Sequence, residues 1–373
     1  MQHAAYWITI SHLKRWTNAQ INELIKQIYH VHGSDLPEFF TLDIEEWKNI
    51  YSIDDKQLPS LLEAKGQIAN NAFLAEDLYN QGFELIPLNA SEYSPTMKDN
   101  LKLTYSPPLL YIKGNKQLLL EDSIAIVGSR NASTKGLKFT ENVAKKASAD
   151  YKVIVSGFAK GIDKAALDNA IKYHGHSIIV LPQGVMTFGS GYKTYYKHII
   201  EGDVLVLSTF HPKAPWKVEL AMARNPIIYG LAKEIFVADS SSSGGTWSGV
   251  KDGLRKGRTI YVRRSNDDES SANNLLIDLG GVAVDEYGKP ESQRTTEEKV
   301  MTPTNKQDDL PGRIIDLLTN ATLTAKEICD KLEIDISPKS MAVVLGQMDQ
   351  LEKVKIGRSF KYRLRQQEIF DLD

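Results

Sequence analysis

The sequence predicts an α/β protein in which a mostly parallel sheet is covered by helices on both faces. Eight short, apolar and β-branched segments alternate with polar or amphipathic helical segments, which is the order typical of parallel sheets. A helical region precedes this alternating part, and three more helical segments follow it. Because 373 residues exceed one ordinary domain, we expect two or three domains, and the pattern divides the chain into three parts.

Residues 1–82 are expected to form a small N-terminal helical domain of the SAM-like kind. Thr17 is a candidate helix cap, and apolar residues follow it at helical spacing as far as Gly33, a typical stop. A second helical pattern covers residues 56–82. The glycine-rich hairpin of a helix-hairpin-helix DNA module is not evident, so we interpret this region as a packing domain.

Residues 83–285 are expected to contain the sheet. Each candidate strand is short and almost continuously apolar, as strands buried on both faces should be. The candidates are FELIPL (83–88), LLYIKG (109–114), SIAIVGS (123–129), KVIVSG (152–157), HSIIVLP (176–182), DVLVLS (203–208), EIFVAD (234–239) and RTIYVR (258–263).

Four of these strands run into turns rich in glycine, serine or both, at residues 128–130, 156–163, 181–185 and 240–249. Ligands of parallel sheets bind beyond the carboxyl ends of the strands, so informative residues are expected in these turns. Glycine allows backbone N–H groups to approach a ligand, and helix N-termini add unpaired N–H groups and a positive dipole end. Together the turns predict a phosphate-recognition face.

Arg130 and Lys160 are the candidate cations of this face. The planar fork of an arginine can hold a phosphate through two parallel hydrogen bonds. Any single turn could equally be an ordinary tight turn, with Arg130 in a surface ion pair, but four such turns favour the phosphate interpretation. The further candidates are Gly128, Ser129, Ser156, Gly157, Gly161, Arg224, Asn225, Gly244, Gly245 and Thr246.

Common catalytic and cofactor motifs are absent from the sequence. No GxGxxG follows a strand, and neither GxxxxGK[ST], GxSxG nor HExxH occurs. His174 and His176 precede a strand without a carboxylate or cysteine at metal-ligand spacing, so we interpret them as solvated loop histidines. We therefore expect no catalytic residue, no metal site and no cofactor, and a binding protein rather than an enzyme.

Composition restricts the cellular compartment and the kinds of partner that we expect. A formal net charge of −2 means that any basic surface must be local. The single cysteine, Cys329, excludes a disulfide framework and fits a reducing compartment. The first residues lack the order of a signal peptide, and no apolar run approaches the roughly 18 residues of a membrane span. We expect a cytoplasmic protein that does not contact a membrane.

Residues 286–309 read as a flexible linker, because they are polar, with two prolines and few apolar residues. Residues 310–366 then give three helical segments and a hairpin around Gly357 and Arg358, which match a winged-helix domain. Its local positive charge comes from Lys339, Arg358, Lys361, Arg363 and Arg365. The segment SPKSMAVVLGQMDQL would be the recognition helix, and it carries few basic side chains. We therefore favour a protein-interaction or dimerising role over duplex DNA contact.

An ordered series of motifs resembles the DNA-processing protein A family (DprA/Smf). The segments IAIVGSRNAS, VIVSGFAKGID, IIVLPQGV and ARNPIIYGLA carry the resemblance, and NNLLIDLGGVAV resembles the segment that closes the family's domain. The resemblance implies an extended Rossmann-like domain over residues 83–285 that binds and protects single-stranded DNA. It also implies loading of RecA recombinase during natural transformation, in a homodimer.

The sequence departs from the family's pattern at several positions. Ala221 replaces the usual aromatic residue, and Pro226 replaces the second arginine of the common RNR motif. Trp216 could instead stack on bases, or it could simply pack. The SGGTWSG segment is similar to the phosphate loop of the lysine-decarboxylase-like (LOG) nucleotide enzymes, but their glutamate is missing. A nucleotide-ligand sensor, a nucleotide-processing enzyme or a pure interaction protein therefore stay open as alternatives.

Overall fold

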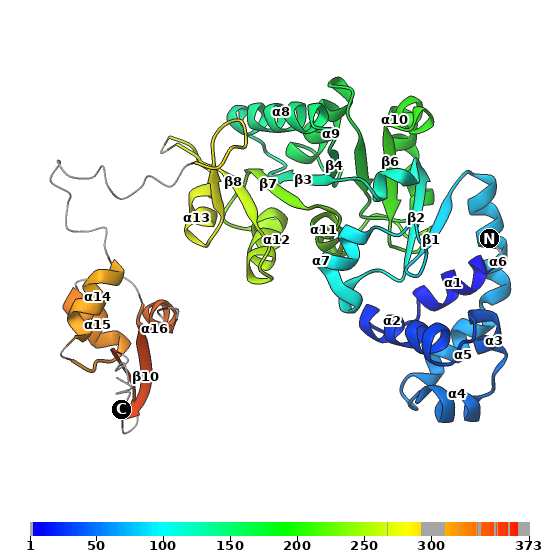
Figure 1. Cartoon of the computed structure of the whole chain (residues 1–373), viewed down its shortest axis with the longest axis horizontal. Helices are drawn as coiled ribbons and strands as arrows, with labels where there is room; N and C mark the ends of the chain where they lie inside the picture. The colour runs from blue at the N-terminus through cyan, green and yellow to red at the C-terminus, as the bar shows by residue number, and fades with distance from the viewer. Residues whose placement is uncertain are drawn as a thin grey trace, which may run out of the picture. The chain divides into compact units, whose positions relative to one another are not determined.

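The structure, a computed structural model, divides into two compact units, residues 1–292 and 293–373, shown in Figure 1. None of the helices in the described part of the chain is both long and apolar enough to cross a membrane. The structure describes residues 3–266, 268–291, 310–319, 321–332, 334, 337–346, 348, 350–356 and 359–364.

A nine-stranded sheet forms the centre of the first unit, in the order β1-β2-β6-β5-β4-β3-β7-β8-β9. Neighbouring strands are parallel along the part of this order that runs from β6 through β3 to β9. At the other edge, β2 pairs antiparallel with both β6 and β1. The α/β prediction and all eight expected strands are confirmed. The strands are β1 (Glu84–Pro87), β2 (Leu109–Gly114), β3 (Ser123–Gly128), β4 (Val153–Ser156), β5 (Ser177–Val180), β6 (Val204–Ser208), β7 (Glu234–Asp239), β8 (Ile260–Arg263) and β9 (Val282–Val284).

Helices cover both faces of the sheet, because the strands carry apolar side chains on both sides. Ile124 and Ile126 of β3 pack in one cluster with α8 and α9, whereas Ala125 and Val127 pack in another with α7, α11, α12 and α13. This alternation is the period of two that a strand imposes. The helices are α7 (Pro95–Tyr105), α8 (Thr134–Ala149), α9 (Ile162–Lys172), α10 (Gly189–Glu201), α11 (Val218–Leu231), α12 (Gly244–Arg255) and α13 (Asn273–Asp278).

The N-terminal helices pack on the sheet and share its core. Trp7, Ile21 and Trp47 belong to one buried cluster with Tyr111 of β2 and Val206 of β6. The cluster therefore ties this region to the sheet. The helices are α1 (Ala4–Ser11), α2 (Asn18–Lys26), α3 (Leu36–Thr41), α4 (Ile44–Tyr51), α5 (Leu58–Gly66) and α6 (Ile68–Asn80), with a π-helical turn η1 (Gln27–Val31).

The start of α2 follows the sequence prediction. The Thr17 hydroxyl accepts a hydrogen bond from the Gln20 N–H at 3.3 Å, and the Gln20 side chain accepts one from the Thr17 N–H at 2.9 Å. This reciprocal capping box satisfies two N–H groups that a bare helix end leaves unpaired. The chain then passes through η1 and turns at Gly33, whose φ is +62°.

The first residues of the predicted linker are attached to the sheet unit. The Asn142 side chain donates to the carbonyl of Glu286 at 3.0 Å, Arg264 pairs with Glu291 at 2.7 Å, and Pro290 bridges to Val284. Residues 292–309 lie outside the described part of the chain. The domain boundaries stay a prediction.

In the described residues of the second unit, three helices are followed by a two-stranded antiparallel ribbon, in the predicted order. Its buried cluster includes Ile314, Ile328, Met341 and Tyr362. Gly357, Arg358 and Arg365 lie outside the described residues, and the winged-helix assignment stays a prediction. The elements are α14 (Leu310–Leu318), α15 (Ala325–Leu332), α16 (Pro338–Gly346), β10 (Leu351–Ile356) and β11 (Ser359–Leu364).

Candidate functional site

The candidate site lies where the strand order reverses. β3 has β4 on one side and β7 on the other, so the connections leave the sheet centre in opposite directions. Ligands of open α/β sheets bind in the crevice outside the carboxyl ends of the strands at such a point. A cleft of about 460 Å³ opens here, and we call it the switch-point cleft.

The lining of the switch-point cleft combines polar turns with apolar helix residues. Turns after β3 and β7 supply most of the polar part together with residues of α9 and α11, and α11 supplies most of the apolar part. The polar side chains are those of Ser129, Arg130, Asn131, Asp163, Arg224, Asn225, Ser241, Ser243 and Thr246. The apolar side chains are those of Val127, Val218, Ala221, Met222, Ile228 and Tyr229. Such a lining suits a ligand with both an anionic and a flat apolar part.

The turn after β3 presents Arg130 to solvent. Backbone bonds hold the turn, because the Ser129 N–H donates to the Asp239 carbonyl at 2.8 Å. A β-carbon at Gly128 would lie 2.6 Å from Ile162 Cγ1 and 2.9 Å from the Asp239 carbonyl oxygen, so only glycine fits. The Arg130 side chain is exposed and pairs with no residue that the structure describes. Its guanidinium is therefore free for a ligand.

The turn before α9 packs directly on this first turn. Gly161 has a φ of +89°, and a β-carbon there would lie 2.3 Å from the Ser129 carbonyl oxygen. The Ile162 N–H also donates to the Ser129 carbonyl at 3.2 Å. Lys160 is exposed beside this contact and, like Arg130, has no partner within the described ranges. The two predicted cations therefore come from turns that touch.

Ser156 and Gly157 lie deeper than a phosphate contact requires. Ser156 is fully buried, and its hydroxyl already donates to the Ile126 carbonyl at 2.8 Å. Gly157 is also buried, against the side chain of Arg224. Ser156 therefore joins β4 to β3 rather than facing the cleft.

Arg224 is buried as well, although its position in the sequence predicts a phosphate contact. Its Nη1 donates to the Val180 carbonyl at 2.9 Å, and burial lowers the pKa of its guanidinium. Burial raises the pKa of the neighbouring Asp163 carboxyl, while Arg224 and three backbone N–H groups act in the opposite direction. Arg224 lines the cleft from below and joins α11 to the end of β5.

Two helix N-termini near the cleft differ in what occupies them. At α8, the Ser133 hydroxyl accepts from the Gly136 N–H at 3.0 Å, and the Asp239 carboxylate accepts from the Ser133 N–H at 2.9 Å. At α12, Ser243 gives no side-chain cap, and Gly244, Gly245 and Thr246 line the cleft. The α12 N–H groups are therefore available to an anion, whereas a protein carboxylate already holds the α8 end.

Asn225 and Trp216 take different positions. The Asn225 side chain donates to the Gly245 carbonyl at 3.5 Å, so it links α11 to the start of α12. Trp216 is 49% exposed in the loop before α11 and so remains available for stacking. Ala221 is buried in the lining, and Pro226 lies inside α11.

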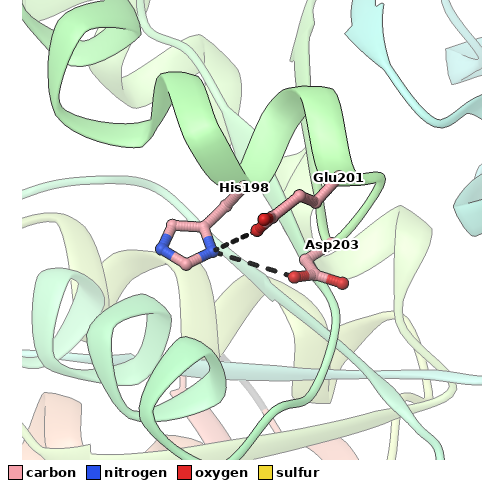
Figure 2. A group of neighbouring side chains, drawn as sticks. All are labelled: His198, Glu201 and Asp203. Carbon is pink, nitrogen blue, oxygen red and sulfur yellow. Dashed lines mark ion pairs between the residues drawn. The ribbon is translucent and has the colours of Figure 1, made fainter.

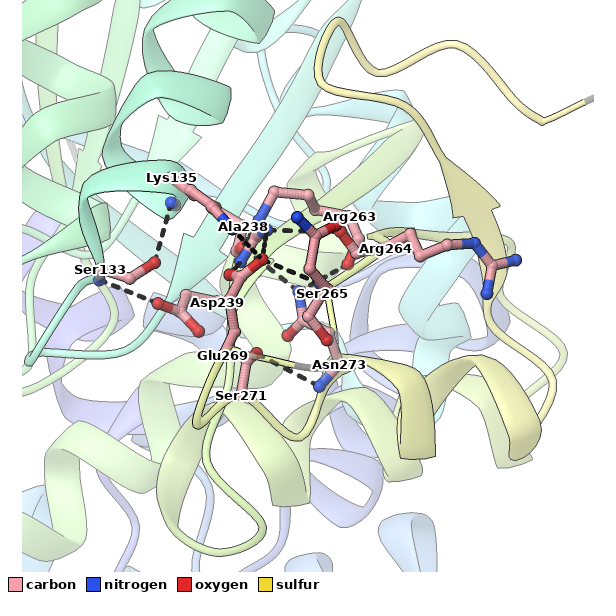
Figure 3. Close-up of polar contacts among 12 residues, drawn as sticks. Ser133, Lys135, Ala238, Asp239, Arg263, Arg264, Ser265, Glu269, Ser271 and Asn273 are labelled. Carbon is pink, nitrogen blue, oxygen red and sulfur yellow. Dashed lines mark hydrogen bonds and ion pairs between the residues drawn. The ribbon is translucent and has the colours of Figure 1, made fainter.

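A network of polar side chains lies at the carboxyl ends of β7 and β8, as Figure 3 shows. Arg263 at the end of β8 is buried and forms an ion pair with Glu269 at 2.7 Å, while its Nε donates to the Ala238 carbonyl at 2.7 Å. The Asn273 side chain donates to the carbonyls of Ala238 and Arg263. Sequence reasoning missed this network and the roles of Asp163 and Asp239, since Ala238 lies far along the chain from Arg263 and Asn273, as Arg224 does from Asp163 and Ser133 from Asp239.

The turn at residues 181–185 is closed by protein rather than open to a ligand. A β-carbon at Gly184 would lie 2.2 Å from the Pro212 carbonyl oxygen, and the Gly184 N–H donates to the Ala214 carbonyl at 2.9 Å. Three of the four predicted turns thus contribute residues to the switch-point cleft, and this one does not.

The fold and the cleft together define a class: Rossmann-like α/β proteins with a cleft at the switch point of the sheet. Within that class, the chain belongs to the family of the DNA recombination-mediator protein A, which matches residues 84–289, more than half of the chain. The resemblance seen in the sequence is confirmed.

Curated relatives and a solved structure agree with this membership. A DNA processing protein DprA from Streptococcus pneumoniae is 36% identical over 158 residues, or 42% of this chain and 55% of that protein. Protein Smf from Escherichia coli is 27% identical over 205 residues, 54% of either chain. The matched segments thus span about half the length of these curated relatives. The X-ray structure of DprA from S. pneumoniae has a TM-score of 0.62 and 26% identity, covering 76% of this chain and 94% of that one.

Proposed function

We propose that this chain binds single-stranded DNA along the carboxyl edge of its sheet. Arg130 and Lys160 neutralise phosphates, and the N–H groups at the start of α12 donate hydrogen bonds to a further phosphate. The observation that carries the proposal is the pair of exposed cations on two touching turns, of which Arg130 lines the cleft. Phosphate contacts carry no base information, so sequence specificity is expected to be low.

The apolar part of the cleft gives the bases a place to lie. Met222 and Val218 are 44% and 61% exposed, and both line the cleft from α11. Trp216 stands exposed just before that helix, where it can stack on a base. Stacking on such groups tolerates any base, which fits non-specific strand binding.

The role of this binding follows from the family. A recombination mediator that coats a single strand and hands it to RecA recombinase needs no catalytic residue, and we propose that this chain acts in that way as a cytoplasmic homodimer during natural transformation. It does so without a metal or nucleotide cofactor in the cleft. The family's description as a recombination mediator supports the proposal.

A nucleotide ligand is the second candidate. The cleft volume of about 460 Å³ suits a single nucleotide, with the phosphate at the uncapped start of α12 and the base on the apolar lining. Asp252 is already paired with Arg255 and Lys256, which leaves no evident catalytic carboxylate at this helix and argues for a sensor over an enzyme.

A fluorescence anisotropy titration with labelled oligo-dT tests the proposal. We expect binding to strands of about ten or more nucleotides, with duplex and thymidine monophosphate as weak competitors. The logarithm of the affinity should fall with the logarithm of salt concentration by about 0.7 for each phosphate contact. Stronger competition by the mononucleotide would select the second candidate, and affinity that does not respond to salt would exclude both.

A further inference from the structure

A cluster of metal-ligating side chains lies at the amino end of the strands, opposite to the carboxyl edge that forms the switch-point cleft. His198 and Glu201 belong to the last turns of α10, and Asp203 comes directly before β6. Figure 2 shows the His198 ring pointing between the two carboxylates. His176, directly before β5, reaches the same Asp203 from the neighbouring strand.

The donor atoms of His198, Glu201 and Asp203 are spaced for one metal ion, since they all lie within 4.8 Å of one another. His198 Nδ1 lies 3.7 Å from Asp203 Oδ2 and 3.9 Å from Glu201 Oε2. Donors on a tetrahedral zinc ion with bonds of about 2.1 Å stand about 3.4 Å apart. Both separations from His198 exceed this value by about 0.5 Å or less, which rotation of partly exposed side chains can supply.

The backbone holds these side chains in place without a metal. His198 and Glu201 are three residues apart in α10, so they lie on one face of the helix. Gly202 ends the helix with a φ of +91°, and the Asp203 N–H donates to the His198 carbonyl at 2.9 Å. The register of β5 and β6 pairs Ser177 with Val204, which sets His176 beside Asp203. The end of α10 and the start of β6 thus bring three donors together, and the start of β5 places His176 beside Asp203.

The charges around the cluster favour a cation. Two carboxylates stand at the C-terminal end of α10, where the helix dipole is already negative. Lys197 approaches only Oε1 of Glu201, at 3.7 Å, and leaves Oε2 directed at His198. The His198 imidazole brings no fixed charge when neutral, so a divalent ion would balance the two carboxylates.

We propose that His198, Glu201 and Asp203 form a binding site for a divalent transition metal, with zinc as the best match and water as the fourth ligand. One imidazole nitrogen and two carboxylate oxygens are donors that zinc accepts in tetrahedral sites. The bound ion ties the end of α10 to the start of β6. This site is separate from DNA binding and does not depend on it.

Isothermal titration of the metal-free full-length protein with zinc chloride tests the site. We expect one zinc ion per chain at the strongest site, and at least about a tenfold loss of affinity in His198→Ala and in Asp203→Asn. Zinc should raise the melting temperature of the wild type but not that of His198→Ala. His174→Asn is the matched control, because His174 is exposed nearby, lies outside the cluster and has a φ of +55° that asparagine tolerates.

The contrary result is equally clear. If zinc binds the wild type and His198→Ala with the same affinity, or raises both melting temperatures alike, the cluster is only an ion-pair network. Should His198→Ala fold poorly without metal, Glu201→Gln makes the same comparison within α10 and Asp203→Asn makes it from the start of β6. Retention of wild-type zinc affinity in these variants would overturn the proposal.

Discussion

The guanidinium of Arg224 lies so close to Gly157 that a β-carbon at position 157 would stand 1.6 Å from Nη1. The same Nη1 donates to the Val180 carbonyl, so one side chain from α11 rests on the end of β4 and bonds to the end of β5. The buried Arg224 therefore lines the switch-point cleft in a position that only a glycine at 157 permits. The exposed Arg130 remains available to a ligand.

Gly157→Ala should destabilise the protein by about 1–3 kcal/mol, because the new methyl group overlaps a side chain that is itself buried and bonded. Urea denaturation measures the effect. Gly66→Ala is the control, since a β-carbon at Gly66 meets nothing within 4 Å, and it should leave stability unchanged or slightly higher. Equal stability of both variants would mean that Arg224 can move aside at no cost.

Arg224→Met should lower stability by about 3–5 kcal/mol, because it leaves the buried Asp163 carboxylate without its positive neighbour. Adding Asp163→Asn in the same chain should recover part of the loss. Urea denaturation of the two variants and the wild type measures both changes. A variant with wild-type stability but weakened oligo-dT binding would show instead that Arg224 contacts phosphate directly.

Arg130→Ala should weaken oligo-dT binding by about 1–3 kcal/mol and reduce the salt slope by about one phosphate contact. Arg130→Lys should recover only part of the affinity, because lysine keeps the charge and loses the planar fork. The melting temperature should hardly change, since the side chain is exposed and unpaired among the described residues. Lys193→Ala, on the exposed face of α10, is the charge-matched control. A lower melting temperature with full affinity would make Arg130 a structural residue.

Acid should loosen the contact between α8 and α9 through Glu141. Hydrogen bonds from Lys172, Tyr173 and Lys138 lower the pKa of this carboxyl from 4.5 to about 2. A lowered pKa in the folded state adds stability above pH 4.5 that is lost as the pH falls towards 2. Glu141→Gln should therefore be less stable than the wild type at pH 7 and lose less on acidification through this window. Denaturation midpoints at several pH values, with Glu121→Gln as control, measure it, and parallel curves would contradict the assignment.

Much of the architecture could be predicted from local patterns. The runs SIAIVGS and EIFVAD became buried parallel strands, because their apolar content and length match nothing else as well. Thr17 caps α2 as its position indicates, since capping depends on residues three apart. The exposure of Arg130 and Lys160 also follows from sequence, because turns at strand ends face solvent.

The fates of other candidates depended on long-range packing. Ser156 ends β4, and Arg224 of α11 lies against the ends of β4 and β5. Both residues are near the carboxyl ends of the strands, as Arg130 is, yet both are buried. His176 has no carboxylate nearby in sequence, but Asp203 lies 3.6 Å away in space. The turn at residues 181–185 is filled by a loop some thirty residues later in the chain.

The sequence by itself determined the order of strands and helices along the chain, the edge of the sheet at which we propose that a ligand binds, and the family to which the chain belongs. These features depend on residue spacings of two to four and on short motifs, which a linear pattern retains. Only the tertiary structure decided which polar groups pair with one another and which remain for a ligand. The physical reason is strand order: hydrogen bonding sets β7 against β3 and β5 against β6, and neighbouring strands decide which side chains are desolvated together.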